Sequence, residues 1–376
     1  MGIVVFFCML VALYGVKIAR GENIVVMPSL SIDERYDSNV RFAGTGQDAE
    51  SDFLTILSPQ ITAVSEQKNL NLNGLYRLAS QHYSKNKELN YISHTVSLSM
   101  NARLSQNSSL SAGDSFAYTQ YSLEAADTGI QTRRTDITSN AVFVTTKHEL
   151  SSQASVSMTL RGSLSEFKEP AMVDTKTYSA ALTGAYRISA ASTVNTTYEY
   201  SKFLFDTNEN VENHSLQIGI TERPAEDISF DVSGGIVYMP EVDGQYNWTA
   251  GANITKRFQQ AAVSIGYTRG VSNTSGLTDE VGIADRVSLR WNQTLAKSLD
   301  MTISGDISKN RSEPSARVDM LSYNAGISAT WQLYAWMAIG TGYSHFQQWD
   351  DNTLTGDVAR DQVFMNVTVT PAEWRL

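Results

Sequence analysis

The chain has 376 residues, 42% of them hydrophobic, and carries 39 acidic against 29 basic side chains, which gives a formal net charge of −10. This acidic balance argues against a nucleic-acid-binding protein, which would present a basic surface to phosphates. The only cysteine is Cys8, so beyond the N-terminal segment the sequence excludes disulfides, thiolate metal sites and a cysteine nucleophile.

The first 21 residues are predicted to be a signal peptide. Ile3 to Val16 is an almost wholly apolar run, shorter than the roughly 20 residues that a spanning helix needs and of the length of a signal-peptide core. Ala19 and Gly21 are the small residues that a signal peptidase reads, so we expect cleavage after Gly21. The alternative is a retained N-terminal anchor helix. No second apolar run of about 18 residues follows, and we predict no transmembrane helix.

From Asn23 to Thr370 the dominant hydrophobic period is two. Apolar residues alternate mainly with Ser, Thr, Asn or Gly, and the clearest such segments in chain order are 96–104, 154–160, 228–236, 301–307 and 321–331. Successive side chains of a strand point to opposite faces, so alternation over this length predicts β-strands with one apolar and one polar face.

The length of these segments favours a membrane barrel over a soluble sandwich. They run to roughly 10–14 residues, whereas soluble strands have a mode of about 5–6 and tilted membrane strands need about 9–11 in the hydrocarbon. The polar face is small and mostly neutral, as expected of a wall that faces water inside a barrel. Short and long connections also alternate along the chain, which is typical of outer-membrane barrels.

Counting the connections gives eight tight turns and nine longer loops, and hence eighteen strands. We therefore predict an all-β fold: a transmembrane, antiparallel, up-and-down β-barrel of about 18 strands, with 16 as the alternative. Residues 22–376 would form this single domain. No long segment stands out as a plug, although the loops Asp37–Glu50 and Val271–Val281 could fold inward.

Aromatic residues cluster at the predicted strand ends, which indicates the two aromatic girdles of a barrel in lipid. One girdle would comprise Tyr198, Tyr200, Phe203, Phe205, Tyr238, Tyr246, Trp248, Tyr267, Tyr343, Phe346 and Trp349, and the other Phe258, Trp331, Tyr334 and Trp336. Pro28 and Pro59 do not fit strand interiors, because a closed barrel has no edge strand that tolerates proline. We expect them at strand starts, bulges or a register break.

Two stretches near the start of this domain carry a family resemblance. Met27 opens M-P-S-L-S-I-D-E-R-Y-D-S-N-V-R-F, and Glu50 to Ala63 reads E-S-D-F-L-T-I-L-S-P-Q-I-T-A. Over about 40 residues this resembles the β-barrel porins of the exopolysaccharide-associated type, which often accompany exosortase-linked polysaccharide loci. The resemblance implies an outer-membrane barrel that serves as a route or scaffold for polysaccharide. The C-terminus departs from the usual pattern, since Pro371 follows the last strand and only Trp374 could supply its terminal aromatic.

Residues suited to chemistry are sparse. None of the five histidines lies at a metal-ligand spacing from another, and no G-x-S-x-G elbow is present. Asp350, Asp351 and His345 gather near one predicted rim, where a hydrated acidic loop explains them better than a catalytic site. We therefore predict that the protein is not an enzyme and has no catalytic, cofactor-binding or metal-binding residues.

Charged residues on the polar face are the candidate functional residues. Alternation assigns to the lumen Arg103, Arg161, Arg187, Asp231, Arg286, Arg290, Asp300 and Asp306. Charges of both signs on a pore wall can tune selectivity. The alternative is that they pair across the barrel and only maintain its shape.

The leading interpretation is a porin-like channel or scaffold in the bacterial outer membrane, for exopolysaccharide export or saccharide passage, because about 16–18 strands leave room for an aqueous channel. A barrel that sheathes a multihaem cytochrome is the second, and a barrel enzyme the third. The expected partners are outer-membrane lipid and a polysaccharide or periplasmic export partner, without nucleic acid. No feature of the sequence sets an oligomeric state.

Overall fold

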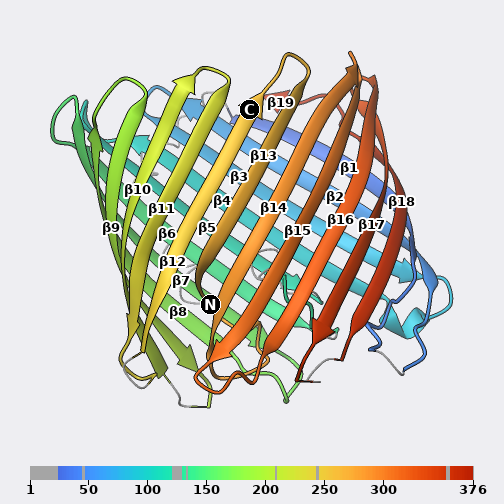
Figure 1. Ribbon diagram of the computed structural model, residues 1–376. Coiled ribbons are helices and arrows are strands. Elements are labelled where there is room, and N and C mark those ends of the chain that lie inside the picture. The colour runs from blue at the N-terminus through green and yellow to red at the C-terminus, as the bar shows by residue number, and fades with distance from the viewer. Residues whose placement is uncertain are drawn as a thin grey trace.

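The computed structural model describes residues 24–44, 47–120, 129–132, 134–207, 210–242, 245–352 and 356–375, which form one β-barrel (Figure 1). The predicted signal peptide, residues 1–21, lies outside the described residues. No helix among the described residues is long and apolar enough to cross a membrane.

Eighteen strands of 12 to 16 residues make the wall. They are Ile24–Asp37 (β1), Asp52–Gln67 (β2), Leu70–Tyr83 (β3), Tyr91–Arg103 (β4), Ser108–Thr119 (β5), Ile137–Glu149 (β6), Ala154–Phe167 (β7), Thr175–Arg187 (β8), Ser192–Phe205 (β9), Asn210–Ala225 (β10), Ile228–Met239 (β11), Gln245–Arg257 (β12), Ala261–Ser272 (β13), Val281–Ala296 (β14), Leu299–Glu313 (β15), Asp319–Tyr334 (β16), Met337–Asp350 (β17) and Val358–Val369 (β18). A 3-10 turn, Lys87–Leu89 (η1), and a two-residue strand, Trp374–Arg375 (β19), complete the described elements.

Each strand pairs antiparallel with its neighbours in sequence, and β1 closes the barrel by pairing with β18 from Leu30↔Val369 to Asp37↔Gln362. The predicted up-and-down barrel of about 18 strands is therefore confirmed. Tight turns join the strands at one end, which we name the turn end, and longer connections join them at the other, the loop end.

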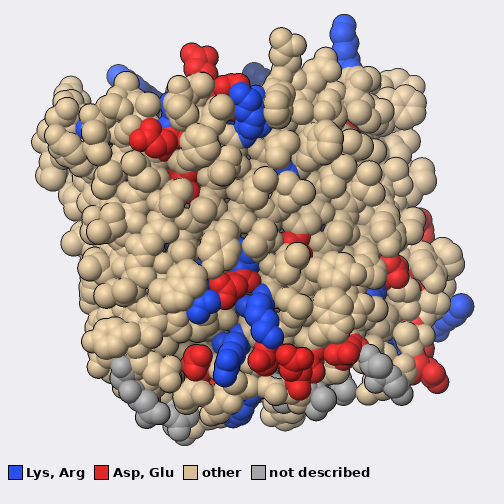
Figure 2. Space-filling model, in the orientation of Figure 1, with Lys and Arg blue, Asp and Glu red and all other residues tan. Residues whose placement is uncertain are grey.

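The outer face of the wall is apolar. On β10, Leu216, Ile218 and Ile220 are exposed on one face, whereas Ser215 and Gln217 lie on the other and line a cavity that residues of β7 and β13 share, which makes theirs the lumen face. Figure 2 shows a broad uncharged zone around the middle of the wall, with acidic and basic side chains gathered mainly toward the loop end. This distribution is that of a wall that crosses lipid.

The aromatic residues expected in the girdles divide between the two faces. Tyr246, Trp248 and Trp349 are exposed toward the loop end, Tyr198 and Tyr343 are exposed near the middle of their strands, and Phe258, Trp331, Tyr334 and Trp336 are exposed toward the turn end. Phe203, Phe205 and Phe346, expected in the same girdle, are instead buried on the lumen face. Their positions have the opposite parity to Tyr198 and Tyr343, so the strand period turns them inward.

Pro28 and Pro59 lie within strands rather than at their starts, and each accompanies an interrupted ladder. Near Pro28 the partner of β1 changes from β18 to β19, and the register shifts by one residue. Val26 pairs with Trp374, whereas continuation of the β18 register would place it opposite Glu373. At Pro59 the β2–β3 ladder omits two residues between Leu57 and Gln60 without a change of register. A proline lacks the N–H that a ladder needs, which accounts for both gaps.

The apolar outer face can be tested with arginine. Ile218 is 60% exposed near the middle of β10, and Ile218→Arg should cost about 2–4 kcal/mol of folding free energy in lipid, because it places a charge in hydrocarbon. The control Gln217→Arg, one residue away on the lumen face, should cost much less. Urea unfolding in lipid vesicles measures both, and equal losses would contradict the assignment of faces.

Candidate functional site: the loop-constricted lumen

A described part of the β5–β6 connection, residues 129–132, lies in the lumen. Ile130 is 1% exposed and packs against Val318 and Met320, at the start of β16. β16 lies across the barrel from β5, and Gly129 also contacts the lumen-facing Ser308 and Ser322, so residues 129–132 lie inside the wall. Residues 129–132 therefore form an inserted segment, which narrows the lumen near the loop end.

The inserted segment is held by hydrogen bonds to its backbone. The Gln131 N–H donates to Gln348 Oε1 (3.0 Å), and Gln348 Nε2 donates to the Gln131 carbonyl (3.2 Å). Ser322 Oγ donates to the Gly129 carbonyl (2.9 Å). Gly129 has φ +74°, and a Cβ there would lie 2.7 Å from the Ser308 Cβ, so only glycine fits. Gln348 thus satisfies both peptide groups of one residue, which fixes the segment against β16 and β17.

Two further loops fold inward. In the β13–β14 connection Thr274, Ser275 and Thr278 are buried, and the Gly276 carbonyl accepts a 2.8 Å hydrogen bond from the Val173 N–H, between β7 and β8 on the far wall. In the β1–β2 connection Val40 packs against Leu54 and Tyr83, and Phe42 against Phe346 and Val358. Both are loops that the sequence identified as candidates for folding inward.

Arg134 joins the β5–β6 connection to the β1–β2 connection. Its guanidinium donates to Tyr83 Oη (2.7 Å), to Gln120 Oε1 (2.6 Å) and to the Val40 carbonyl (3.4 Å). Val40 packs against the same Tyr83 that Arg134 binds. The β1–β2 and β5–β6 connections therefore contact each other and a shared residue of the wall.

A buried carboxylate anchors the β13–β14 connection. Glu280 is 5% exposed and accepts hydrogen bonds from Ser312 Oγ and from the Ser315 N–H (3.2 Å), with the Arg317 guanidinium at 3.1 Å. Burial alone would raise the pKa of this carboxyl, but the hydrogen bonds from Ser312 and Ser315 and the Arg317 charge outweigh burial and hold the pKa below its ordinary value.

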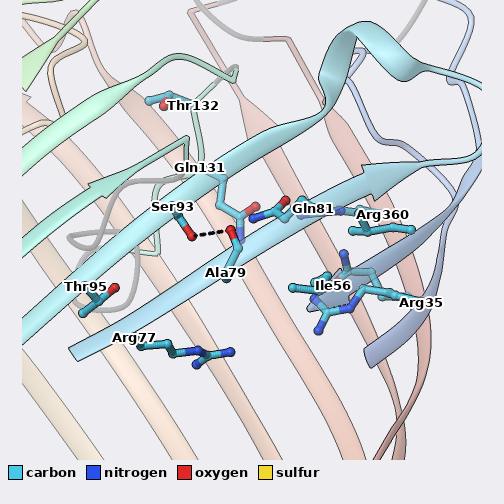
Figure 3. A pocket seen from close by; sticks show the side chains of 12 residues that line it. Arg35, Ile56, Arg77, Ala79, Gln81, Ser93, Thr95, Gln131, Thr132 and Arg360 are labelled. Atoms are coloured by element: carbon cyan, nitrogen blue, oxygen red, sulfur yellow. Dashed lines mark hydrogen bonds between the residues drawn. The ribbon is translucent and has the colours of Figure 1, made fainter. Parts of the chain in front are cut away.

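Beneath the inserted segment lies a cavity of about 420 Å³ with a basic lining (Figure 3). Three arginines reach it from separate strands: Arg35 from β1, Arg77 from β3 and Arg360 from β18. The remaining lining is mostly neutral and polar and includes Gln131 and Thr132 of the inserted segment; it comprises Leu54, Ile56, Ala79, Gln81, Ser93, Thr95, Gln131, Thr132 and Gln362.

The three arginines differ in their neutralisation. Arg360 makes a two-pronged pair with the fully buried Asp37 (Nε to both carboxylate oxygens, 3.0 Å) and lies over the Phe42 ring. Arg35 pairs with Asp33 at 3.2 Å. Arg77 contacts Ser58 Oγ at 3.4 Å and pairs with no carboxylate in the described part of the chain. The cavity therefore keeps an excess of positive charge, which is largest at Arg77.

The sequence did not single out these arginines. Arg35 and Arg77 have lumen parity in their strands, but their convergence with Arg360 depends on the β1–β18 closure, which joins the two ends of the chain. Parity alone could have placed them on the lumen face, together with the residues that were named.

The eight lumen charges named from the sequence lie on the polar face of their strands but are mostly scattered. Only Arg286 and Asp306 come together, with nitrogen and oxygen 3.4 Å apart. Asp231 and Asp300 each accept a 2.7 Å hydrogen bond from a neighbouring threonine, and Arg161 lines a second cavity. Arg103, Arg187 and Arg290 line none of the described cavities. The pairing thus favours a structural role for Arg286 and Asp306, and a role in the pore remains a proposal for the others.

The structure separates the three residues of the predicted acidic rim, His345, Asp350 and Asp351. His345 lies between Tyr323 Oη and Asp361 Oδ1, both at 2.8 Å, on the outer face of β17. Asp350 is buried on the opposite face of the same strand, and Asp351 lies near Lys309. Among the described residues no group of His, Cys, Asp and Glu could hold a metal ion.

Comparison with known proteins identifies the fold. The sequence matches no protein-family model and no curated protein sequence. Among solved structures, Acinetobacter baumannii OccAB3 is similar with a TM-score of 0.51 and 8% identity over 94% of this chain and 100% of that one. Pseudomonas aeruginosa OccK2 gives 0.50 and 11%, over 92% and 98%, and the P. aeruginosa siderophore receptor PirA gives 0.50 and 7%, over 94% and 81%. The chain shares their barrel fold.

Removing the Gln348 side chain, which holds the inserted segment, should widen the channel. Gln348→Ala deletes both hydrogen bonds to Gln131, each worth about 0.5–1.5 kcal/mol, so the inserted segment should leave its position more often. We expect a larger and noisier single-channel conductance in a planar bilayer. The matched control Gln347→Ala, on the outer face of β17, should conduct as the parent does; a Gln348→Ala trace identical to the parent would show that the segment does not limit conduction.

The Glu280 anchor should fail in acid. Because its pKa is lowered in the folded state, the carboxylate contributes stability above the ordinary glutamate range, and this contribution is lost as pH falls through the lowered pKa. The protection factors of the amides in residues 277–280 against hydrogen exchange should therefore fall on acidification, after correction for the slower intrinsic exchange in acid. Glu280→Gln should give low protection factors at every pH, and a variant that keeps the parent's pH dependence would contradict this assignment.

Proposed function

We propose that the protein is a loop-constricted, porin-like channel of the bacterial outer membrane that favours anionic, hydrophilic solutes. The observation that carries the proposal is the cavity beneath the inserted segment, where Arg35, Arg77 and Arg360 converge in the lumen of an 18-strand barrel. A cation-lined constriction attracts anions and repels cations, because the field is strongest where the passage is narrowest.

The outer membrane is the proposed location because the outer face of the wall suits lipid. Its outer face carries exposed Leu, Ile and Val between two zones of exposed aromatic residues, and β1–β18 pairing leaves no free edge at closure. Export through a signal peptide that is cleaved after Gly21 belongs to the same proposal.

We further propose that the solutes include saccharides. Support comes from the hydroxyl and amide lining of the lumen, which can exchange hydrogen bonds with a polyhydroxylated solute, and from the resemblance to exopolysaccharide-associated porins. Acidic saccharides would satisfy both the arginines and this lining. A cytochrome sheath is less well supported, because three inward loops occupy the space that a haem protein would need.

Charge reversal at the constriction tests the channel. In a KCl gradient across a planar bilayer, the refolded parent should show a steady conductance and a reversal potential that indicates anion preference. Arg77→Glu should shift this potential toward cation preference, with at least a several-fold fall in the anion-to-cation permeability ratio, because Arg77 has no paired carboxylate.

Lys68→Glu is the matched control. It makes the same change of charge in the tight turn between β2 and β3, outside the cavity, and should leave the permeability ratio unchanged. A silent parent would contradict an open channel, and a parent without anion preference would remove the role assigned to the arginines. Block of the current by uronic-acid oligosaccharides, but not by neutral ones, would support acidic saccharides as solutes.

A further inference from the structure

The barrel wall parts between β12 and β13 toward the loop end. Their ladder stops at Ala250↔Arg269, although β12 extends to Gln245 and β13 to Ser272. On their other sides these ends remain paired, β12 with β11 and β13 with β14 up to Ser272↔Gly282. Figure 1 shows β12 and β13 diverging toward the loop end. Three or more residues on each strand thus face one another without pairing, and we name this place the seam.

The seam forms where the chain leaves the wall. After Ser272 the β13–β14 connection turns into the lumen and reaches Phe167 and Val173 on the far side, so it adds no further backbone beside β12. An unpaired strand edge is costly in lipid, because its N–H and C=O groups find no partner there. A seam at this position therefore requires either a cover or an occupant that supplies hydrogen bonds.

On the outer face one side chain spans the seam. The Arg269 guanidinium of β13 donates to Asn247 Oδ1 of β12 at 3.2 Å and lies over the Trp248 ring, 4.3 Å from its centroid. It also pairs with Asp285 of β14. The backbone N–H of Trp248 donates to Asn247 Oδ1 (2.9 Å) rather than to a carbonyl of a neighbouring strand. Arg269 thus forms a side-chain strap in place of backbone pairing.

On the lumen side the seam borders a cavity of about 440 Å³. Thr249 and Ser272, one from each side of the seam, line this cavity, and their buried hydroxyls have no hydrogen-bond partner among the described residues. Thr249 is only 5% exposed. Buried hydroxyls without partners are uncommon and indicate a place that a polar group from elsewhere can fill.

The same cavity has an apolar side. Phe203, Val237 and Val271 line it and belong to or pack against one buried apolar cluster. The rest of the lining consists of hydroxyl and amide side chains such as Ser215, together with one charge of each sign, Arg161 and Glu199. Outside the wall, Tyr246 is 73% and Trp248 51% exposed beside the seam. An apolar path from the cavity to the lipid therefore runs next to a row of hydroxyls.

We propose that the seam is a lateral portal between the lumen and the outer leaflet, through which an amphiphile with an uncharged, hydroxyl-rich head and a hydrocarbon chain passes. The head would bind the hydroxyls of the cavity at Thr249 and Ser272, the hydrocarbon chain would run from Val271 in the cavity past Trp248 into the lipid, and the Arg269 side chain would move aside. This goes beyond the channel proposed above, which needs no opening in the wall. A peptide strand added to the β12 edge is the competing occupant, but it would use only the edge and not the cavity behind it.

Cysteine accessibility from the lipid phase tests the portal. In a Cys8→Ser background, which leaves no other cysteine, Ser272→Cys and Thr249→Cys place a thiol on each side of the seam. The protein in nanodiscs is treated with an octadecyl maleimide confined to the bilayer and, separately, with a charged water-soluble maleimide. We expect the bilayer reagent to label both variants at least tenfold faster than Ser304→Cys, a matched serine on the lumen face of β15, away from the cavity. Adding Arg269→Ala should raise the rate further.

The outcomes separate the portal from the channel. Labelling of S272C and T249C no faster than S304C would overturn the portal. The portal would also be overturned if adding R269A to S272C or T249C did not raise the labelling rate, because Arg269 would then not restrict access to the seam. Ion conductance of each variant is recorded in parallel and reports the channel alone. Protection of both thiols by dodecyl maltoside, but not by an added β-strand peptide, would identify an amphiphile as the occupant; the reverse pattern would replace the portal with an edge-binding site.

Discussion

The wall of this protein is governed by the need to satisfy every backbone N–H and C=O in a medium without water. The eighteen antiparallel ladders meet that need around the barrel, and β1–β18 pairing removes the last free edge. Once the backbone is committed in this way, side chains alternate between lipid and lumen by geometry alone. The inward loops and the arginine cavity lie toward the loop end, where water can satisfy the backbone and this demand is relaxed. At the β12–β13 seam, by contrast, the wall itself leaves the demand unmet.

The sequence was sufficient for the wall because the wall is periodic. Alternation over long segments and the rhythm of short and long connections gave the strand count, and the pairing registers agree with it. Prediction was less successful for aromatic residues, which occur both in lipid-facing girdles and in buried apolar clusters inside the lumen. Phe203, Phe205 and Phe346 were assigned to a lipid girdle from their chemistry, although their parity places them in the lumen, where loops bury them.

The candidate site could not be predicted because it is made by contacts between distant parts of the chain. Gln348 binds the backbone of Gln131, more than two hundred residues away, and Arg35 meets Arg360 only through barrel closure. No local pattern carries such information. The sequence analysis identified the loops Asp37–Glu50 and Val271–Val281 as able to fold inward. It counted the β5–β6 connection, whose inserted segment contacts the arginine cavity, only as one of the nine longer loops.

Strand β1 has a consequence for how the barrel is made. Among the described strands it comes earliest in the sequence, yet its closing partners, β18 and Trp374–Arg375 (β19), come latest and are therefore synthesised after it. Until then its edge stays open and ready to pair with any other strand, which is a hazard for aggregation. Near Pro28 the partner of β1 changes from β18 to β19, so Trp374 and Arg375 add a second, separate pairing with β1. The barrel therefore cannot close before its last strand is present, and a chain truncated before β18 would be left with two unpaired edges for cellular quality control to recognise.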